Sequence, residues 1–131
     1  MATIEPAARA LLEAPNFAHV ATLREDGTIL NVPVWVHVEG DDVVLNSAEG
    51  RAWPANLRRT GKITVTVSNS ENPYEFVSIT GHLDREDSET ADDNINALAK
   101  KYLGQDEYPF RQPGEVRVTY KIEPASVNAH G

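Results

Sequence analysis

Apolar and polar residues alternate most regularly between Ile29 and Glu39. One face of an extended chain there carries Leu30, Val32, Val34, Val36 and Val38, and the other carries Asn31, Pro33, Trp35 and His37. Alternation with a period of two predicts a β-strand with one buried face. A similar pattern runs from Lys62 to Asn69, where isoleucine and valine alternate with threonine and serine. The chain is therefore expected to be rich in half-buried strands.

Turn-forming residues divide the chain into short segments, which together predict six strands. The predicted strands are Phe17–Arg24, Ile29–Glu39, Val43–Asn46, Lys62–Asn69, Tyr74–Asp84 and Glu115–Pro124. Asp26-Gly27 suits a tight hairpin turn, because glycine adopts positive φ at little cost. Gly81 suits a β-bulge within the fifth strand. In the last strand, the side chains expected to face inward are those of Val116, Val118, Tyr120 and Ile122.

Three segments have helical character. Ile4–Leu12 has a proline in its first turn, and a short helix is expected after Gly50. Asp87–Leu103 has acidic residues at its start and lysines at its end, which complements the helix dipole. Its apolar stripe consists of Ala91, Ile95, Leu98 and Tyr102. Gly104 suits the position just after the end of this helix.

Strands joined mainly by hairpins, with helices outside them, predict a single mainly β domain over residues 1–131. The expected architecture is a six-stranded antiparallel barrel with a few flanking helices. A barrel of six strands encloses side chains but no ligand. Any cofactor is therefore expected outside the barrel, in a groove at a subunit interface.

Composition excludes several classes of protein. The net charge of −8 over 131 residues argues against a general nucleic-acid binder. The absence of cysteine excludes disulfides, thiolate chemistry and cysteine metal sites. No apolar run approaches the roughly 20 residues of a membrane span, and no signal peptide is visible. A cytoplasmic location without a membrane partner is the default expectation.

The segment Val43–Arg59 predicts an anion-binding site. It reads as an apolar strand, a polar turn that contains Gly50, and a helix that opens near a proline. The first N–H groups of a helix lack partners and the dipole is positive there, so phosphate is favoured. Ser47, Arg51 and Asn56 are the candidate contacts. The alternatives are a turn or cap for Ser47, a salt bridge for Arg51 and a solvent-facing position for Asn56.

No catalytic constellation is visible in the sequence. The four histidines, His19, His37, His82 and His130, lack the spacing of metal ligands, and no metal site is expected. The serines lack the context of a nucleophile. A bound cofactor is therefore the expected source of any chemistry, with no catalytic side chain. His37 shares a strand face with Trp35 and could contact a substrate there.

Several short motifs, taken in order, resemble the split β-barrel family of flavin- and deazaflavin-binding proteins typified by pyridoxamine 5′-phosphate oxidase. The motifs are Phe17–Leu23, Asp26-Gly27, Asn31–Trp35, Gly50-Arg51, Asn56–Arg59, Glu71–Tyr74 with Gly81, Lys101–Gly104 and Glu115–Arg117. They look closest to the branch of probable coenzyme F420-dependent oxidoreductases. The resemblance implies a six-stranded split barrel and an oxidoreductase in which F420 transfers hydride to an unidentified small organic substrate.

The resemblance also implies where ligands bind. Family members are homodimers with two cofactors in grooves between the subunits. The phosphate would contact Ser47, Arg51 and Asn56, and the ring would lie against Asn31, Pro33, Val34 and Trp35. A residue near Pro73-Tyr74 of the other subunit would close the site, with Tyr74 as the candidate cofactor contact. His37, Trp35 and Trp53 would border the substrate.

Two residues leave alternatives open. Pro33 interrupts the hydrogen-bond ladder of its strand, which fits either an edge strand or bulge, or a strand that presents its backbone to a ring. Many relatives have lysine at the position of Trp53, so Arg51, backbone N–H groups and Arg58 would have to hold the phosphate here. Trp53 could instead stack on the ring or wall the substrate pocket, as a cofactor contact. FMN is the alternative cofactor, and a non-catalytic flavin- or deazaflavin-binding protein is the alternative function.

Overall fold

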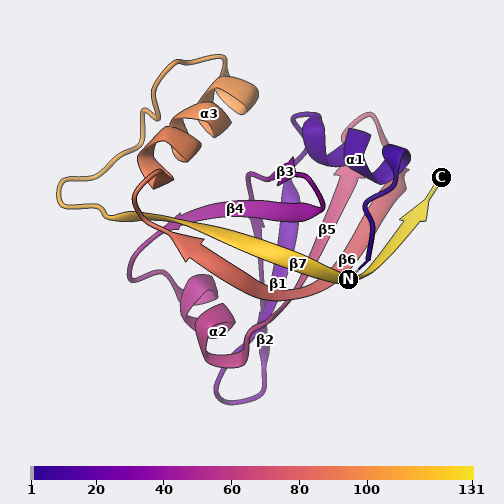
Figure 1. Ribbon diagram of the computed structural model, residues 1–131, viewed down its shortest axis with the longest axis horizontal. Coiled ribbons are helices and arrows are strands. Elements are labelled where there is room, and N and C mark those ends of the chain that lie inside the picture. The colour runs from indigo at the N-terminus through magenta and orange to yellow at the C-terminus, as the bar shows by residue number, and fades with distance from the viewer. Residues whose placement is uncertain (1) are drawn as a thin grey trace.

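The computed structural model describes residues 2–131, and seven strands within them form one antiparallel sheet. The strands are β1 (Ala18–Leu23), β2 (Ile29–Val34), β3 (His37–Glu39), β4 (Asp42–Ala48), β5 (Lys62–Asn69), β6 (Asn72–Asp87) and β7 (Arg117–His130). The helices are α1 (Pro6–Glu13), α2 (Ala52–Thr60) and α3 (Ala91–Leu103). The strand order is β2-β1-β5-β6-β7-β4-β3. In Figure 1, α3 and α2 lie on either side of β4 and β7.

The expected six-stranded barrel is wrong, because the segment Ile29–Glu39 forms two strands instead of one. These strands, β2 and β3, lie at the two opposite edges of the sheet. Between them, the N–H of Val36 donates to Tyr102 Oη at 3.1 Å, and its carbonyl accepts from Lys101 Nζ at 2.6 Å. Contacts with α3 thus replace the strand ladder at this point. The result is an open, curled seven-stranded sheet whose two edge strands are consecutive in the chain.

The predicted alternation of buried and exposed residues holds within most strands. Ile63, Val65 and Val67 are buried in β5, whose bounds agree with the prediction. The pairing of β6 with β7 shifts register at Gly81, which confirms the bulge. A Cβ at Gly81 would lie 2.7 Å from Cγ2 of Ile122, so a side chain does not fit there. The inward position expected for Val116 is wrong, because Val116 precedes β7 and is 55% exposed.

The main helix begins later than predicted because β6 continues through Asp87. Asp87 pairs with β7, and its carboxylate accepts the N–H groups of Glu89 and Thr90 at 2.8 and 3.2 Å. This turn keeps the predicted first residues out of the helix, which starts at Ala91. At the other end, Gly104 adopts φ +71°, as expected for the residue after a helix.

The main core lies between the curled sheet, α1 and α2. Its fully buried members include Leu12, Val20, Leu45, Leu57, Val65, Ile79 and Ile122. α3 packs against β4 and β7, but its buried residues are not part of this cluster. A space is therefore left between α3 and the start of α2. No helix within residues 2–131 is long and apolar enough to cross a membrane.

Candidate functional site

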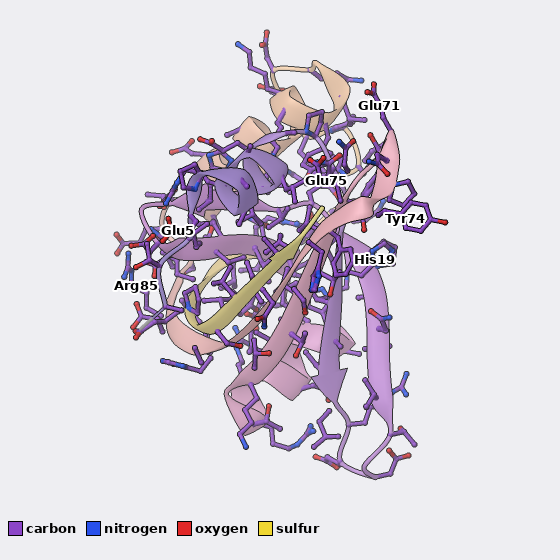
Figure 2. All side chains as sticks on the ribbon, turned by 90° about the vertical axis from the view of Figure 1, so that its right-hand side faces the viewer. Glu5, His19, Glu71, Tyr74, Glu75 and Arg85 are labelled. Carbon is purple, nitrogen blue, oxygen red and sulfur yellow. The ribbon has the colours of Figure 1, made fainter. Side chains whose placement is uncertain are left out.

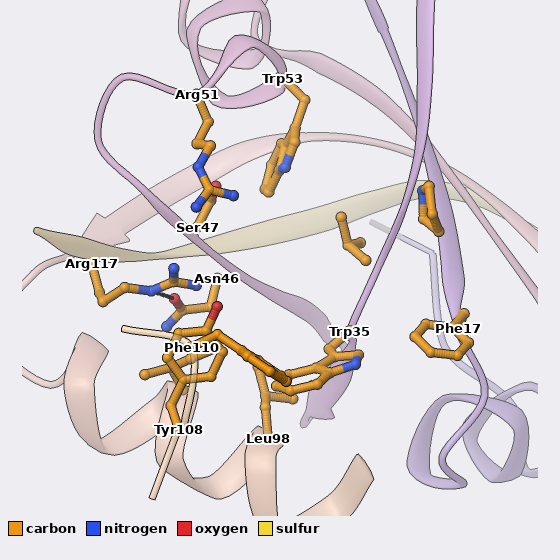
Figure 3. Close-up of a pocket in the computed structure, with 13 residues that line it drawn as sticks. Phe17, Trp35, Asn46, Ser47, Arg51, Trp53, Leu98, Tyr108, Phe110 and Arg117 are labelled. Carbon is orange, nitrogen blue, oxygen red and sulfur yellow. Dashed lines mark hydrogen bonds between the residues drawn. The ribbon is translucent and has the colours of Figure 1, made fainter. Parts of the chain in front are cut away.

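A pocket of about 200 Å³ lies between the start of α2 and α3 (Figure 3). The predicted site residues that line it are Pro33, Val34, Trp35, Ser47, Arg51 and Trp53. They come from the end of β2, the link to β3, the end of β4 and the beginning of α2. The fold therefore brings together the strand expected to carry a ring and the turn expected to carry a phosphate.

One wall of the pocket is aromatic. The Trp35 ring stacks on Tyr102 with centroids 5.2 Å apart and an interplanar angle of 6°. Tyr108 meets Trp35 edge-on at 5.9 Å and Phe110 at 5.7 Å. The Tyr102 hydroxyl donates to the Asn16 carbonyl at 2.6 Å, and burial raises the pKa of Tyr102 to about 12. This wall offers a fixed aromatic surface to a planar ligand.

The side of the pocket at the start of α2 is polar and positively charged. Gly50 adopts φ +91° where the chain turns from β4 towards α2, and Arg51 is the N-cap residue of the helix. The N–H groups of Ala52 and Trp53 at the start of α2 have no intrahelical partner, and no side chain within residues 2–131 caps this end; Pro54, the third helical residue, has no N–H. Ser47 is buried, whereas the Arg51 side chain is 56% exposed. This arrangement suits a phosphate or a carboxylate.

A buried arginine in the same pocket was missed by sequence reasoning. Arg117 donates from Nε to Asn46 Oδ1 at 2.9 Å, and its guanidinium lies 5.0 Å from the Tyr108 ring centroid. Nδ2 of Asn46 donates to the Ala91 carbonyl at 3.0 Å, which ties β4 to α3. Strict alternation placed Arg117 on the outer face of the last strand. The start of α3 and the loop after it cover that face, and no local pattern in β7 reveals this cover.

Other lining residues were missed because they lie in different parts of the chain. They are Phe17, Ile95, Leu98, Tyr108 and Phe110. Ile95 and Leu98 were predicted only as part of the apolar stripe of a helix. Tyr108 and Phe110 lie in the irregular loop after α3, where no periodicity indicates which way a side chain points.

Four predicted site residues lie outside this pocket. Asn31 is exposed on β2, at one edge of the sheet. Tyr74 is 86% exposed and projects away from β6 (Figure 2). Asn56 is buried on the sheet side of α2, where its Nδ2 donates to Thr22 Oγ1 at 3.2 Å. His37 begins β3 and is absent from the pocket lining.

His37 shares its surroundings with Lys101. The Nδ1 atom of His37 is buried without a hydrogen-bond partner. Burial, and then the charge of Lys101, lower the pKa of His37 and so favour a neutral ring. Burial also lowers the pKa of Lys101 to about 8. Within residues 2–131, no three histidine, aspartate or glutamate side chains are grouped so that they could hold a metal ion.

Two residues near the predicted phosphate turn have structural contacts. Arg58 donates to Glu86 from Nε at 3.0 Å and to Glu49 from Nη2 at 2.6 Å, and these carboxylates raise the pKa of Arg58. It does not line the pocket. Trp53 lines it at one side but is only 6% exposed, and its ring meets Tyr120 edge-on at 5.4 Å. The charge on this side of the pocket therefore comes from other residues.

Solved structures with low sequence identity share this fold. An F420 reductase has a TM-score of 0.82 at 21% identity, with 95% of this chain and 98% of that chain covered. A conserved hypothetical protein of Mycobacterium tuberculosis has a TM-score of 0.71 at 17% identity, with 99% and 84% covered. General stress protein 26 of Bacillus anthracis has a TM-score of 0.70 at 13% identity, with 95% and 91% covered. No curated protein sequence matches the chain.

The sequence itself also matches a known family. The match is to pyridoxamine 5′-phosphate oxidase and extends over residues 4–131. It agrees with the resemblance drawn from the ordered motifs. The chain therefore belongs to the pyridoxamine 5′-phosphate oxidase family.

Proposed function

We propose that this protein is a cytoplasmic oxidoreductase that uses the deazaflavin coenzyme F420 for hydride transfer to a small organic substrate. Members of its family bind flavin-type cofactors and are generally oxidoreductases. The observation that carries the proposal is one pocket that joins an aromatic wall at Trp35 to a cationic helix start at Arg51. A planar ring with a phosphate-bearing tail combines the two chemistries that these walls favour.

The residues present fit such a cofactor. Pro33, Val34 and Trp35 would lie against the ring, and Ser47, Arg51 and the first N–H groups of α2 would hold the phosphate. When bound, the cofactor supplies the hydride chemistry, and the protein binds it, orients it and shields it from water. No side chain is assigned a catalytic step. Trp35 and Trp53 would border the substrate.

A second copy of the chain is part of the proposal. Pockets for drug-sized ligands usually have volumes of about 300–1,000 Å³, whereas this pocket has about 200 Å³. A homodimer would add a further wall, as the family resemblance implies. Asn31 and Tyr74, which are exposed in the single chain, would then approach the pocket of the other copy. Sedimentation of the purified protein tests this, and a monomer at micromolar concentration contradicts it.

FMN is the alternative cofactor, and one observation favours it. Arg58 is held by Glu49 and Glu86, and Arg59 donates to Asn56 Oδ1 at 3.0 Å. Arg58 is neutralised by its two carboxylates, Arg59 keeps its charge, and neither arginine lines the pocket, so neither adds a cation to the pocket lining for a long anionic tail. A single phosphate needs only the groups at the start of α2.

Titration of the purified protein with F420 and with FMN, followed by fluorescence, tests the proposal. Arg85→Gln is a matched control, because Arg85 is an exposed arginine of β6 that is paired with Asp84. We expect binding of F420 in the micromolar range in both proteins. If neither F420 nor FMN binds, the proposal is contradicted. If FMN binds and F420 does not, FMN is the cofactor. Tight binding without oxidation of the reduced cofactor by a broad panel of acceptors would indicate a carrier instead of an enzyme.

A further inference from the structure

Arg117 has an unused hydrogen-bond donor at the pocket. Its side chain is only 4% exposed, its Nε binds Asn46, and its Nη1 lies 3.4 Å from Glu115 Oε2. Its Nη2 has no hydrogen-bond partner within residues 2–131. Only two side-chain polar atoms in that range are fully buried without a partner, His37 Nδ1 and Tyr120 Oη. Because Nη2 of Arg117 also lacks a partner but is not one of them, it is not fully buried. Arg117 lines the pocket, so its guanidinium lies within reach of a ligand there.

Glu115 is shared between two arginines. Its side chain is 5% exposed, with Oε1 3.7 Å from Nη2 of Arg51 and Oε2 3.4 Å from Nη1 of Arg117. Charge-assisted N–H···O bonds are usually about 2.7–2.9 Å long, so both contacts are loose. A buried guanidinium without a counter-ion is costly, and Glu115 offsets this cost for Arg117. Among residues 2–131, no acidic side chain lines the pocket itself.

We infer that Arg51 and Arg117 form a two-arginine clamp for a phosphate-type anion, with Glu115 as the internal counter-ion that the phosphate replaces. The inference rests on the proposed function for the position of the ligand, and it adds a second cation and a competing carboxylate to the site. Trp53 supplies no charge, and Arg58 is bound to two other carboxylates. A planar guanidinium on each side suits the tetrahedral oxygens of a phosphate. The contacts of Glu115 with both arginines are long, so a phosphate competes with no strong ion pair for their N–H groups.

The test compares two ligands that differ by one phosphate, FMN and riboflavin. For Arg117→Met we expect the affinity for the phosphorylated ligand to fall about 10- to 100-fold, with the other ligand within about twofold. For Glu115→Gln we expect the phosphorylated ligand to bind severalfold more tightly, because a competing negative charge is removed. Arg85→Gln is the control and should change neither.

The sign of the Glu115 effect separates a clamp from a purely structural ion pair. Weaker or unchanged binding of the phosphorylated ligand to Glu115→Gln overturns the inference. Equal losses of both ligands in Arg117→Met also overturn it. If Arg117→Met does not fold, Arg117→Lys keeps the charge but not the planar fork. It should still lose affinity for the phosphorylated ligand only.

Pyrophosphate alone distinguishes this inference from the proposed function. A rise in melting temperature with pyrophosphate that is lost in Arg117→Lys supports the clamp, even if no ring-bearing ligand binds. Competition between pyrophosphate and FMN assigns the clamp to the cofactor phosphate. Pyrophosphate binding to the FMN complex with the same dependence on Arg117 assigns it to an anionic substrate. No effect of pyrophosphate on any of these proteins contradicts the clamp.

Discussion

The two ends of α2 carry arginines that look alike in the sequence and differ in the fold. Arg58, in the last turn, binds two carboxylates with contacts as short as 2.6 Å and lies over the Tyr120 ring at 5.4 Å. Arg51, before the first turn, has one long contact of 3.7 Å with Glu115. The helix thus has a charge used for folding at one end and a charge free to bind at the other. A cluster of basic residues is therefore not a site until the partners of each residue are known.

The largest expected effect comes from Leu57, a buried residue of the same helix α2. Leu57 is fully buried in the main core, so Leu57→Ala should lower the free energy of unfolding by about 2–5 kcal/mol. Urea denaturation measures this loss. The exposed control Lys62→Ala should change stability by less than about 0.5 kcal/mol. A small loss of unfolding free energy for Leu57→Ala would show that α2 is not anchored through the core. The two ends of α2 could then not be compared as parts of one fixed helix.

Arg51→Ala should separate binding from stability. We expect the affinity for the phosphorylated cofactor to fall by ~1.5–3 kcal/mol, the scale of a charge-assisted hydrogen bond. The melting temperature of the ligand-free protein should stay nearly unchanged, because the Arg51 side chain is 56% exposed. Calorimetric titration and thermal unfolding measure the two quantities. A large drop in the melting temperature would make Arg51 structural and remove the contrast with Arg58.

Arg58→Ala should give the opposite pattern. Loss of the contacts with Glu49 and Glu86 should reduce the free energy of unfolding by about 1 kcal/mol or less, since solvent screens a side chain that is 36% exposed. Cofactor affinity should stay within about twofold of the original, because Arg58 does not line the pocket. Denaturation at low and high salt measures the stability term. A strong loss of affinity with intact stability would reverse the roles of the two ends.

The last prediction compares Arg58 with a cation that forms no ion pair within residues 2–131. Lys101 donates to the carbonyls of Leu12 and Val36, both at 2.6 Å, and burial lowers its pKa from 10.5 to about 8. Below pH 8 the folded state holds a charge that burial disfavours. Between pH 8 and 10.5 the unfolded chain binds more protons than the folded one, so stability should rise with pH.

The control for this pH effect is Lys101→Met, which should lack the rise between pH 8 and 9.5. The range ends below pH 10 because, above pH 10, the tyrosines lower the stability as the pH rises. Burial raises the pKa of Tyr102 and of Tyr120 to about 12, so the unfolded chain loses those protons first and stability falls. Denaturant unfolding at a series of pH values measures both slopes. Equal slopes in the two proteins would show that burial does not shift the pKa of Lys101.

Local patterns predicted the elements of this fold better than their arrangement. The alternation in β5 and the glycines at positions 81 and 104 each specify a local geometry, and the structure agrees. The break after β2 was missed because it depends on Tyr102 and Lys101, which bind the backbone of Val36 from a distant helix. A regular alternation of apolar and polar residues does not indicate that a distant helix binds the backbone.

The candidate site shows the same division. Ser47 and Arg51 were proposed because a strand, a turn and a helix follow one another in the chain. Arg117 was missed because its surroundings come from β4 and from the loop after α3. Asn56 was predicted as a phosphate contact from its position in α2, and that position does not show that its amide hydrogen-bonds Thr22 of β1. The spacing of residues in the sequence cannot predict the role of a side chain when that role depends on segments far away in the chain.

The edges of the open sheet have a consequence for behaviour at high concentration. An unpaired strand edge is a template on which another chain can add, and aggregation often starts in this way. Here one edge strand, β2, contains Pro33, which has no N–H to donate, and the other, β3, spans only His37–Glu39. Neither edge presents a long uninterrupted row of free backbone groups. The same proline that is a candidate ligand contact thus also interrupts an edge on which another chain could add.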